Sequence, residues 1–144
     1  LFISSKLYNI KYESVQHEVK EILQLMQLKY LDILYLHWPF VNMEETGEFN
    51  HKPLEEIWAE FELCVTKGYV KHLGISNFNG QLIMDLLTYC KIKPAVLQIE
   101  VHPYLPNNAI VEIAQKNGIV VVGYSPLVRG DNLNREDEVN ILKD

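Results

Sequence analysis

The chain has little excess charge and no concentrated basic segment. Its formal net charge is -6 over 144 residues, and Lys and Arg are scattered along its length. Because nucleic acids and anionic membrane surfaces bind basic patches, this composition argues against both kinds of partner. The longest apolar run, residues 31–41, is interrupted by Asp32, His37 and Pro39. It is shorter than the roughly 20 apolar residues that cross a bilayer, so the sequence predicts no membrane span.

Cysteine is scarce, and no metal-binding cluster is evident. Cys64 and Cys90 both fall in helical patterns, as small buried side chains do in a reducing compartment. Nothing indicates a disulfide between them, and we expect a cytoplasmic protein. Glu100 and His102 share one strand face, but no third ligand accompanies them. We therefore expect this pair to be structural and the protein to hold no metal.

Several enzyme motifs are also missing. The chain contains no G-x-G-x-x-G, no G-x-x-x-x-G-K-[ST] and no G-x-S-x-G. The glycine-rich nucleotide motifs and Ser-His-Asp hydrolysis therefore lack support. The first residue is not Met, and no basic leader follows it. We expect the chain to begin inside a strand, at a cut edge.

Apolar strands alternate with amphipathic helices along the chain. The expected strands are residues 1–6, 31–37, 70–76, 95–101 and 119–124. The expected helices are residues 13–27, 54–67, 80–90 and 107–116, with another beginning at 135–143, and the polar loops are 42–52 and 128–134. Apolar side chains recur at helical spacing in the helices, whereas residues 31–37 are almost continuously apolar, as strands of parallel sheets are. Repeated strand–helix units predict right-handed crossovers and a parallel sheet.

Each expected strand ends in polar residues that can do chemistry. These are Lys6, His37, Ser76 with Asn77, Gln98, and Tyr124 with Ser125. The carboxyl ends of parallel strands carry the active site in (β/α)8 barrels. We therefore expect an α/β fold of the (β/α)8 TIM-barrel type, with residues 1–144 as part of a single domain. Such barrels use about 250 residues and eight strands, so this chain accounts for only part of one.

Lys6 and His37 are the first candidates for catalysis. A histidine at a strand end can donate a hydrogen bond to a substrate oxygen, but it can equally bond a backbone carbonyl at the edge of the core. Lys6 should be partly buried, which requires an acidic or phenolic partner. Its charge would then lower the pKa of a neighbouring tyrosine. The structural alternative is a lysine that extends into solvent, which its position alone slightly favours.

Four further residues offer groups to a ligand. Ser76 and Asn77 present donors and acceptors to an amide, although Ser-Asn is also a turn sequence. Gln98 lies in an otherwise apolar strand, and a buried Gln needs a partner, either a ligand amide or an internal network. Tyr124 offers an aromatic face at the same rim, or ordinary packing.

Five segments resemble blocks of the aldo-keto reductase family, in the family's order and with similar separations. They are Ser5-Lys6-Leu7, Leu36-His37-Trp38-Pro39, Lys71-His72-Leu73-Gly74-Ile75-Ser76-Asn77-Phe78, Gln98-Ile99-Glu100-Val101-His102-Pro103-Tyr104-Leu105 and Gly123-Tyr124-Ser125-Pro126-Leu127. The Gly-Ile-Ser-Asn-Phe and His-Pro-Tyr-Leu blocks are the specific ones. The resemblance covers essentially the whole chain and places it at about strands 3 to 7 of the family's barrel.

The resemblance implies an enzyme that reduces aldehydes and ketones with NADPH. By position, Lys6 resembles the lysine that lowers the pKa of the catalytic tyrosine. His37 resembles the histidine that orients the substrate carbonyl. Trp38 resembles a wall of the substrate pocket, and Tyr8 stands where many members have a tryptophan. The implied partner is a small carbonyl compound, and the implied whole protein is a monomer.

The resemblance also implies a set of cofactor contacts. Ser76, Asn77 and Gln98 resemble the residues that hold the nicotinamide carboxamide. Tyr124 resembles the tyrosine that stacks on the nicotinamide ring. Ser125 and Leu127 fall in the loop that contacts the cofactor pyrophosphate.

The chain also departs from the family pattern. The family's proton-donating tyrosine and its partner aspartate precede the third strand, whereas Tyr8 and Tyr12 follow Lys6. The segment for the cofactor's 2′-phosphate lies beyond residue 144, and residues 128–131 differ from the usual small-residue loop. We therefore expect the 144-residue chain alone to be inactive. Two alternatives stay open: a non-catalytic relative that binds nicotinamide as a sensor or channel-associated subunit, and an unrelated phosphate-binding barrel.

Overall fold

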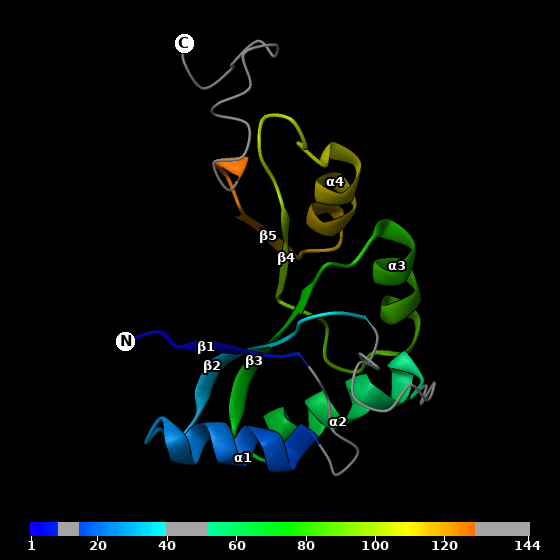
Figure 1. Ribbon diagram of the computed structural model, residues 1–144. Helices are drawn as coiled ribbons and strands as arrows, with labels where there is room; N and C mark the ends of the chain where they lie inside the picture. The colour runs from blue at the N-terminus through cyan, green and yellow to red at the C-terminus, as the bar shows by residue number, and fades with distance from the viewer. Residues whose placement is uncertain (9–14, 40–51, 129–144) are drawn as a thin grey trace, which may run out of the picture.

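The computed structural model describes residues 1–8, 15–39 and 52–128 (Figure 1). Within them the strands are β1 (Ser4–Leu7), β2 (Leu31–Leu36), β3 (Val70–Ser76), β4 (Val96–Glu100) and β5 (Val120–Tyr124). The helices are α1 (Val15–Leu25), α2 (Leu54–Thr66), α3 (Gly80–Tyr89) and α4 (Asn108–Lys116). This confirms the predicted alternation in these ranges. The helix expected at 135–143 and most of both polar loops lie outside the described residues.

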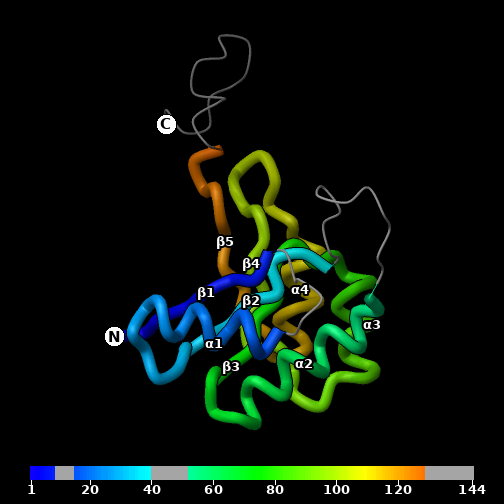
Figure 2. The backbone as a smooth tube through the Cα atoms, turned by 60° about the horizontal axis from the view of Figure 1, so that its bottom comes forward, coloured from blue at the N-terminus to red at the C-terminus, as the bar shows by residue number. Residues whose placement is uncertain are grey.

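The five described strands form one parallel sheet in the order β1-β2-β3-β4-β5. Helices α1 to α4 all lie on one face of this sheet (Figures 1 and 2). The strand direction turns steadily from β1 to β5 (Figure 1), so the sheet curves as part of a barrel wall does. The predicted parallel strand–helix architecture is therefore confirmed, and it leaves the opposite face of the sheet without a described helix.

The core lies between the sheet and its helices. Leu36, Ile75 and Leu97 share one register level on the helix-covered face, and each is at most 1% exposed. From α2, the rings of Trp58 and Phe61 stack at 5.9 Å between centroids. Because apolar burial is the dominant favourable term in folding, this layer fixes the helices against the sheet. This packing therefore also fixes which way the opposite, helix-free face of the sheet points.

Two side chains of α2 hold the loop that enters β4. The Glu62 side chain is buried, and its Oε1 accepts hydrogen bonds from the backbone N–H groups of Lys91 (2.6 Å) and Ile92 (2.8 Å). Trp58 Nε1 donates to the Ile92 carbonyl at 3.1 Å. Trp58 and Glu62 lie one helical turn apart, so a single face of α2 positions the start of β4.

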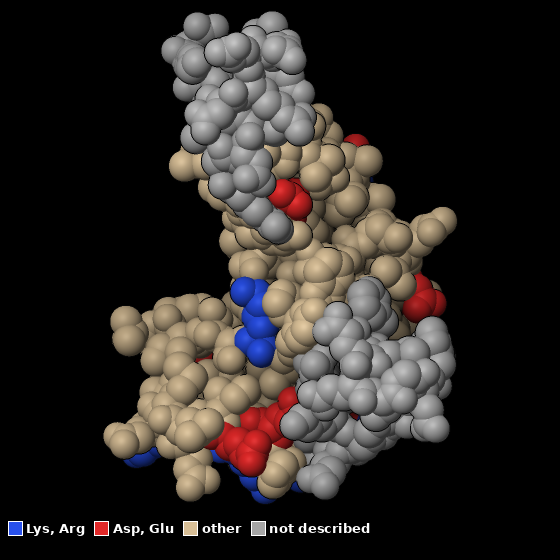
Figure 3. Space-filling model, viewed as in Figure 1, with Lys and Arg blue, Asp and Glu red and all other residues tan. Residues whose placement is uncertain are grey.

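The amino ends of β1 to β3 are joined by a separate polar contact. Asp32 accepts a hydrogen bond from the Ile3 N–H at 2.9 Å and pairs with Lys71 at 3.1 Å. The hydrogen bond from the Ile3 N–H and, as a smaller effect, the interaction with Lys71 hold the pKa of the Asp32 carboxyl below its ordinary value. On the face shown in Figure 3, acidic and basic side chains lie next to one another at the lower end and are few elsewhere. No described helix is long and apolar enough to cross a membrane.

Predicted and observed elements differ at their ends. β1 begins at Ser4 because its pairing with β2 starts with Ser4 opposite Ile33. Helix α1 ends at Leu25 instead of residue 27, since Gln27 has a φ of 55°, which a right-handed helix does not allow. Gly68, with a φ of 76°, follows α2 and ends it, as glycine commonly does after a helix.

Candidate active site

The helix-free face of the sheet carries the candidate residues on successive register levels. Ser76 pairs with Gln98, and His37 follows Leu36, the partner of Ile75, so His37 falls on the level of Ser76 and Gln98. Levels on one face are two residues apart because side chains alternate between faces. Lys6, opposite Tyr35, lies one such level nearer the amino ends of the strands, and Tyr124, opposite Glu100, lies one nearer the carboxyl ends. Parallel pairing therefore brings together residues that are far apart in the sequence, at the edge of the sheet where barrel active sites form.

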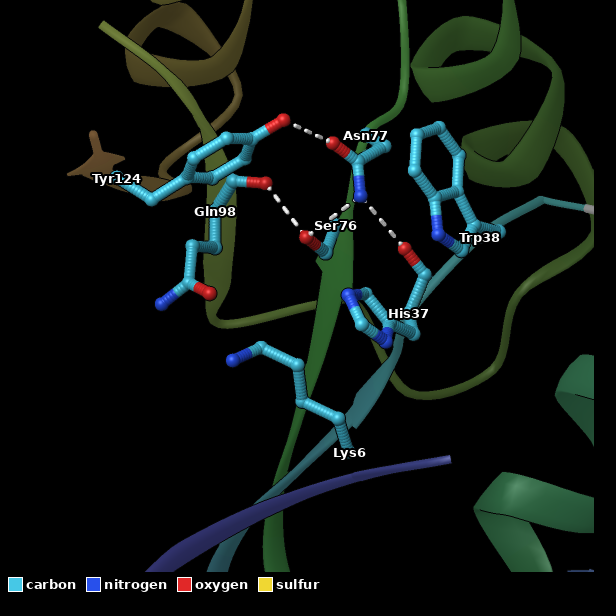
Figure 4. Close-up of a pocket in the computed structure, with 7 residues that line it drawn as sticks. All are labelled: Lys6, His37, Trp38, Ser76, Asn77, Gln98 and Tyr124. Atoms are coloured by element: carbon cyan, nitrogen blue, oxygen red, sulfur yellow. Dashed lines mark hydrogen bonds between the residues drawn. The ribbon is translucent and has the colours of Figure 1, made fainter. Parts of the chain in front are cut away.

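Seven of the candidate residues line a cavity of about 300 Å³ (Figure 4). They are Lys6, His37, Trp38, Ser76, Asn77, Gln98 and Tyr124. Small-molecule sites begin at about this volume. Figure 4 shows the Lys6 amine directed toward the side of the cavity formed by Gln98.

Asn77 joins the ends of several strands. Its Nδ2 donates to the His37 carbonyl at 2.9 Å and to Ser76 Oγ at 3.2 Å, and its Oδ1 accepts from the Tyr124 hydroxyl at 2.7 Å. Its backbone N–H donates to the Gln98 carbonyl at 3.0 Å. Asn77 has a φ of 61°, in the left-handed region that Asn adopts more readily than most residues. This conformation ends β3 while the side chain reaches across to its neighbours (Figure 4).

Ser76 and Gln98 differ in how they are bonded. Ser76 is 1% exposed, and its hydroxyl donates to the Gln98 carbonyl at 2.9 Å. The Gln98 side chain lines the cavity (Figure 4). Within the described part of the chain, no hydrogen bond engages its amide, so it can offer a donor and an acceptor to a ligand.

His37 lies between two aromatic rings. The Tyr8 ring meets the imidazole nearly edge-on at 5.2 Å between centroids, and the Trp38 ring lies at 6.1 Å and 25° to it. Burial and, secondarily, the charge of Lys6 lower the pKa of His37 from its ordinary 6.5. The imidazole is therefore neutral at pH 7 and retains one N–H donor.

Lys6 departs from the expected partial burial. Its side chain is exposed, because β1 is the outer strand of the described sheet and its helix-free face is uncovered. The partner found for it is the ring of Tyr35, with Nζ 5.6 Å from the centroid. Tyr35 was not selected from the sequence, although period-two alternation already places it on the same strand face as His37.

Three predicted site residues lie outside the lining of this cavity. Tyr8 is 48% exposed, and its ring contacts that of His37. Ser125, with a φ of 51°, and Leu127, 64% exposed, follow β5. None of the three is among the residues that line the cavity.

An adjoining cavity of about 240 Å³ shares Trp38, Asn77 and Tyr124 with the first. It is also lined by Glu100 and Asn107, and Asn107 Nδ2 donates to the Glu100 carbonyl at 2.7 Å. Sequence reasoning treated Asn107 only as a helix residue. It stands six residues after the predicted strand 95–101, and its place in the segment that follows a strand's carboxyl end was the signal available for finding it.

Glu100 and His102 lie close enough to interact with each other. Their Oε1 and Nε2 atoms are 3.6 Å apart. Among residues 1–8, 15–39 and 52–128, no group of three or more His, Cys, Asp or Glu side chains is placed to hold a metal ion.

The arrangement defines a class of protein. A parallel sheet covered by helices on one face, with a polar cavity at the carboxyl ends of its strands, is an α/β structure of the (β/α)-barrel type. Within that class the family is also clear. The model of the aldo/keto reductase family matches residues 1–141, and the chain belongs to this family.

Individual relatives support the same assignment. The chain is 38% identical over 154 residues to aldo-keto reductase family 1 member A1 of Rattus norvegicus, covering 99% of this chain and 47% of that protein. It resembles the solved aldose reductase of Schistosoma japonicum at 39% identity and a TM-score of 0.81, covering 90% of this chain and 47% of the other. It resembles a Bombyx mori aldo-keto reductase solved in complex with NADP at 30% identity and a TM-score of 0.78, covering 87% and 41%.

The chain thus spans about half the length of the curated relatives it matches, 47% of the rat protein. Its solved neighbours are aldo-keto reductases with the TIM-barrel fold. The described sheet and helices accordingly belong to a fold of this type, which confirms the predicted fold class.

Proposed function

We propose that the protein reduces aldehydes or ketones to alcohols with NADPH as the hydride donor. The observation that carries the proposal is the register of the site: His37, Ser76 and Gln98 share one level, with Lys6 below and Tyr124 above them around one cavity. Membership of the aldo-keto reductase family supports it. The Bombyx mori relative in complex with NADP supports the choice of cofactor.

The cavity wall fits a nicotinamide. The free amide of Gln98 complements a carboxamide, and Ser76 and Asn77 stand beside it with hydroxyl and amide groups. The aromatic face of Tyr124 suits stacking on a flat heterocycle. Ser125 and Leu127 would meet the pyrophosphate. When bound, the cofactor supplies the hydride that reduces the carbonyl carbon.

His37 acts on the carbonyl oxygen. Its neutral imidazole donates a hydrogen bond to that oxygen, and the bond strengthens as negative charge develops there. The ammonium of Lys6, one level below, favours the phenolate of a proton-donating tyrosine. In the family this tyrosine precedes the segment that residues 1–144 represent. Trp38 and Tyr8 flank His37 and would form walls of the substrate pocket.

The proposal is tested by following NADPH absorbance after an aldehyde is added to the protein at its full encoded length. His37→Gln should lower kcat by about 100-fold or more while leaving the dissociation constant of NADPH within about twofold. His72→Gln is the matched control, because His72 is exposed and lies two levels below Ser76 on the same strand face. Unchanged turnover in His37→Gln would contradict the assigned role.

The same assay separates the two main candidates. NADPH binding without aldehyde reduction would favour the non-catalytic relative, and absence of both would contradict the proposal. We also propose that the 144-residue chain alone is inactive, since it lacks the proton donor. Turnover by that chain at the rate of the complete protein would overturn this. The complete protein is proposed to be a cytoplasmic monomer built on one barrel domain, and light scattering tests the monomer.

A further inference from the structure

Asn107 lies where α4 begins, close to the end of β4. Its backbone has a φ of 50°, in the left-handed region that Asn adopts more readily than most residues. Its side chain makes no hydrogen bond to the first turn of α4, a helix that the structure describes throughout, although an Asn before a helix commonly does so. Its Nδ2 instead donates to the Glu100 carbonyl at 2.7 Å. The side chain therefore stabilises the end of β4 rather than the start of the helix.

The Glu100 carbonyl lies beyond the last pair of residues that joins β3 to β4. This pairing stops at Ser76 and Gln98, and the Gln98 carbonyl accepts a hydrogen bond from the N–H of Asn77, the residue after β3. Because the backbone of a strand repeats every two residues, the Glu100 carbonyl points to the same side as that of Gln98. Asn107 therefore supplies a donor at the position where β3 has already ended.

The same contact closes the segment between β4 and α4 on itself. Within residues 101–106, the His102 N–H donates to the Leu105 carbonyl at 3.2 Å, and the Leu105 N–H donates to the His102 carbonyl at 2.9 Å. The bond from Asn107 to Glu100 joins the residues on either side of this turn. The turn is therefore held both from within and at its two ends.

Val101, the first residue of this turn, contacts the end of β5. Its N–H donates to the Tyr124 carbonyl at 3.3 Å. β5 also approaches it closely at Gly123, where an added Cβ would lie 3.2 Å from the Val101 Cβ. The Tyr124 hydroxyl donates to Asn77 Oδ1 at 2.7 Å. Tyr124 is therefore bonded through its hydroxyl to Asn77 and through its main chain to Val101.

We propose that Asn107 is a positioning residue for Tyr124. By closing residues 101–106 onto Glu100, it holds Val101 where the Val101 N–H fixes the main chain of Tyr124 beside the cavity. The inference rests on the proposed function for its purpose, because that function assigns Tyr124 to stacking on the nicotinamide. Loss of the Asn107 side chain should therefore weaken cofactor binding, although Asn107 does not line the cavity proposed for the nicotinamide.

The first measurement is amide hydrogen exchange at Val101, followed by NMR in the protein at its full encoded length without cofactor. Asn107→Gly keeps the positive φ and removes the donor, so exchange should become about fivefold faster, the equivalent of one net hydrogen bond. Asn107→Asp should have a similar effect, because it places an acceptor against the Glu100 carbonyl. Asn117→Ala is the matched control: Asn117 Nδ2 donates to the Ile113 carbonyl at 2.8 Å at the other end of α4, and its loss should leave exchange at Val101 unchanged.

The second measurement is the dissociation constant of NADPH by fluorescence titration. Asn107→Gly should raise it about fivefold, whereas Asn117→Ala should leave it within about twofold. If Asn107 acts through Tyr124, Asn107→Gly should raise the constant much less in a Tyr124→Leu background than in the wild-type background. Unchanged exchange at Val101, an equal effect of Asn117→Ala, or equal effects in both backgrounds would overturn the inference. A wild-type protein that does not bind NADPH would contradict the proposed function, while the exchange measurement would still decide whether Asn107 holds Val101.

Discussion

Replacement of Asn77 tests how the strand ends that form the site are held together. Its side chain makes three hydrogen bonds, to the His37 carbonyl, to Ser76 Oγ and from the Tyr124 hydroxyl. With a net contribution of about 1 kcal/mol each, and Asn77 only half-buried, Asn77→Gly should lower the free energy of unfolding by about 2–3 kcal/mol. Asn77→Ala should cost about 1 kcal/mol more, because φ is 61° and Ala resists the left-handed region.

The assay is urea denaturation of the protein without cofactor, followed by a fluorescence titration with NADPH. Asn77→Asp should lose less stability than Asn77→Gly, since it keeps an acceptor for Tyr124 and loses only the donated bonds. All three variants should bind NADPH more weakly, because Ser76 and Tyr124 lose the side chain that orients them.

Gln27 provides the matched control for the backbone contribution. It is exposed and has a φ of 55°, but it lies at the end of α1, away from the cavity. Gln27→Gly should be about 1 kcal/mol more stable than Gln27→Ala, with NADPH affinity unchanged in both. The reasoning would be refuted if Asn77→Gly and Asn77→Ala unfolded within about 0.5 kcal/mol of the wild type, below the loss of a single hydrogen bond.

Three further outcomes follow from the described contacts. Glu62→Ala should lower the free energy of unfolding, measured by chemical denaturation, by about 2–4 kcal/mol, because the N–H groups of Lys91 and Ile92 lose their acceptor. Glu62→Gln keeps an acceptor oxygen, so its free energy of unfolding should fall clearly less. The NMR titration of His37 should show a midpoint below 6.5, so its contribution to stability is complete above pH 6.5 and is lost as the pH falls through the lowered pKa; a midpoint at or above 6.5 would contradict this. Burial, with a smaller contribution from a neighbouring carboxylate, raises the pKa of Cys64 to about 11, so this thiol should resist a thiol-specific reagent at pH 8 until the protein is unfolded.

The order of elements followed from the sequence because local patterns encode it. Apolar residues at helical spacing marked α1 to α4, and the continuous apolar run at 31–37 marked a strand, β2, that is buried throughout. Ends were less predictable, since a single backbone conformation such as that of Gln27 depends on tertiary contacts as well as on residue type. The hydrogen bonds from Glu62 and Trp58 to the loop before β4 join residues about 30 positions apart, and no local sequence pattern predicts them.

The candidate residues were found from the sequence because each stands at the carboxyl end of a strand, which is a local property of the chain. Seven of them proved to line one cavity. Their relation to each other was not local. Only the parallel register put His37, Ser76 and Gln98 on one level, and only packing revealed the ring of Tyr35 resting on Gly74 beneath Lys6. The sequence by itself determined which functional groups the protein places at the cavity and at which end of the sheet, because strand periodicity and strand ends depend on residues that are neighbours in the chain. The tertiary structure decided which of those groups meet, because strand pairing and close packing depend on contacts between residues far apart in the chain.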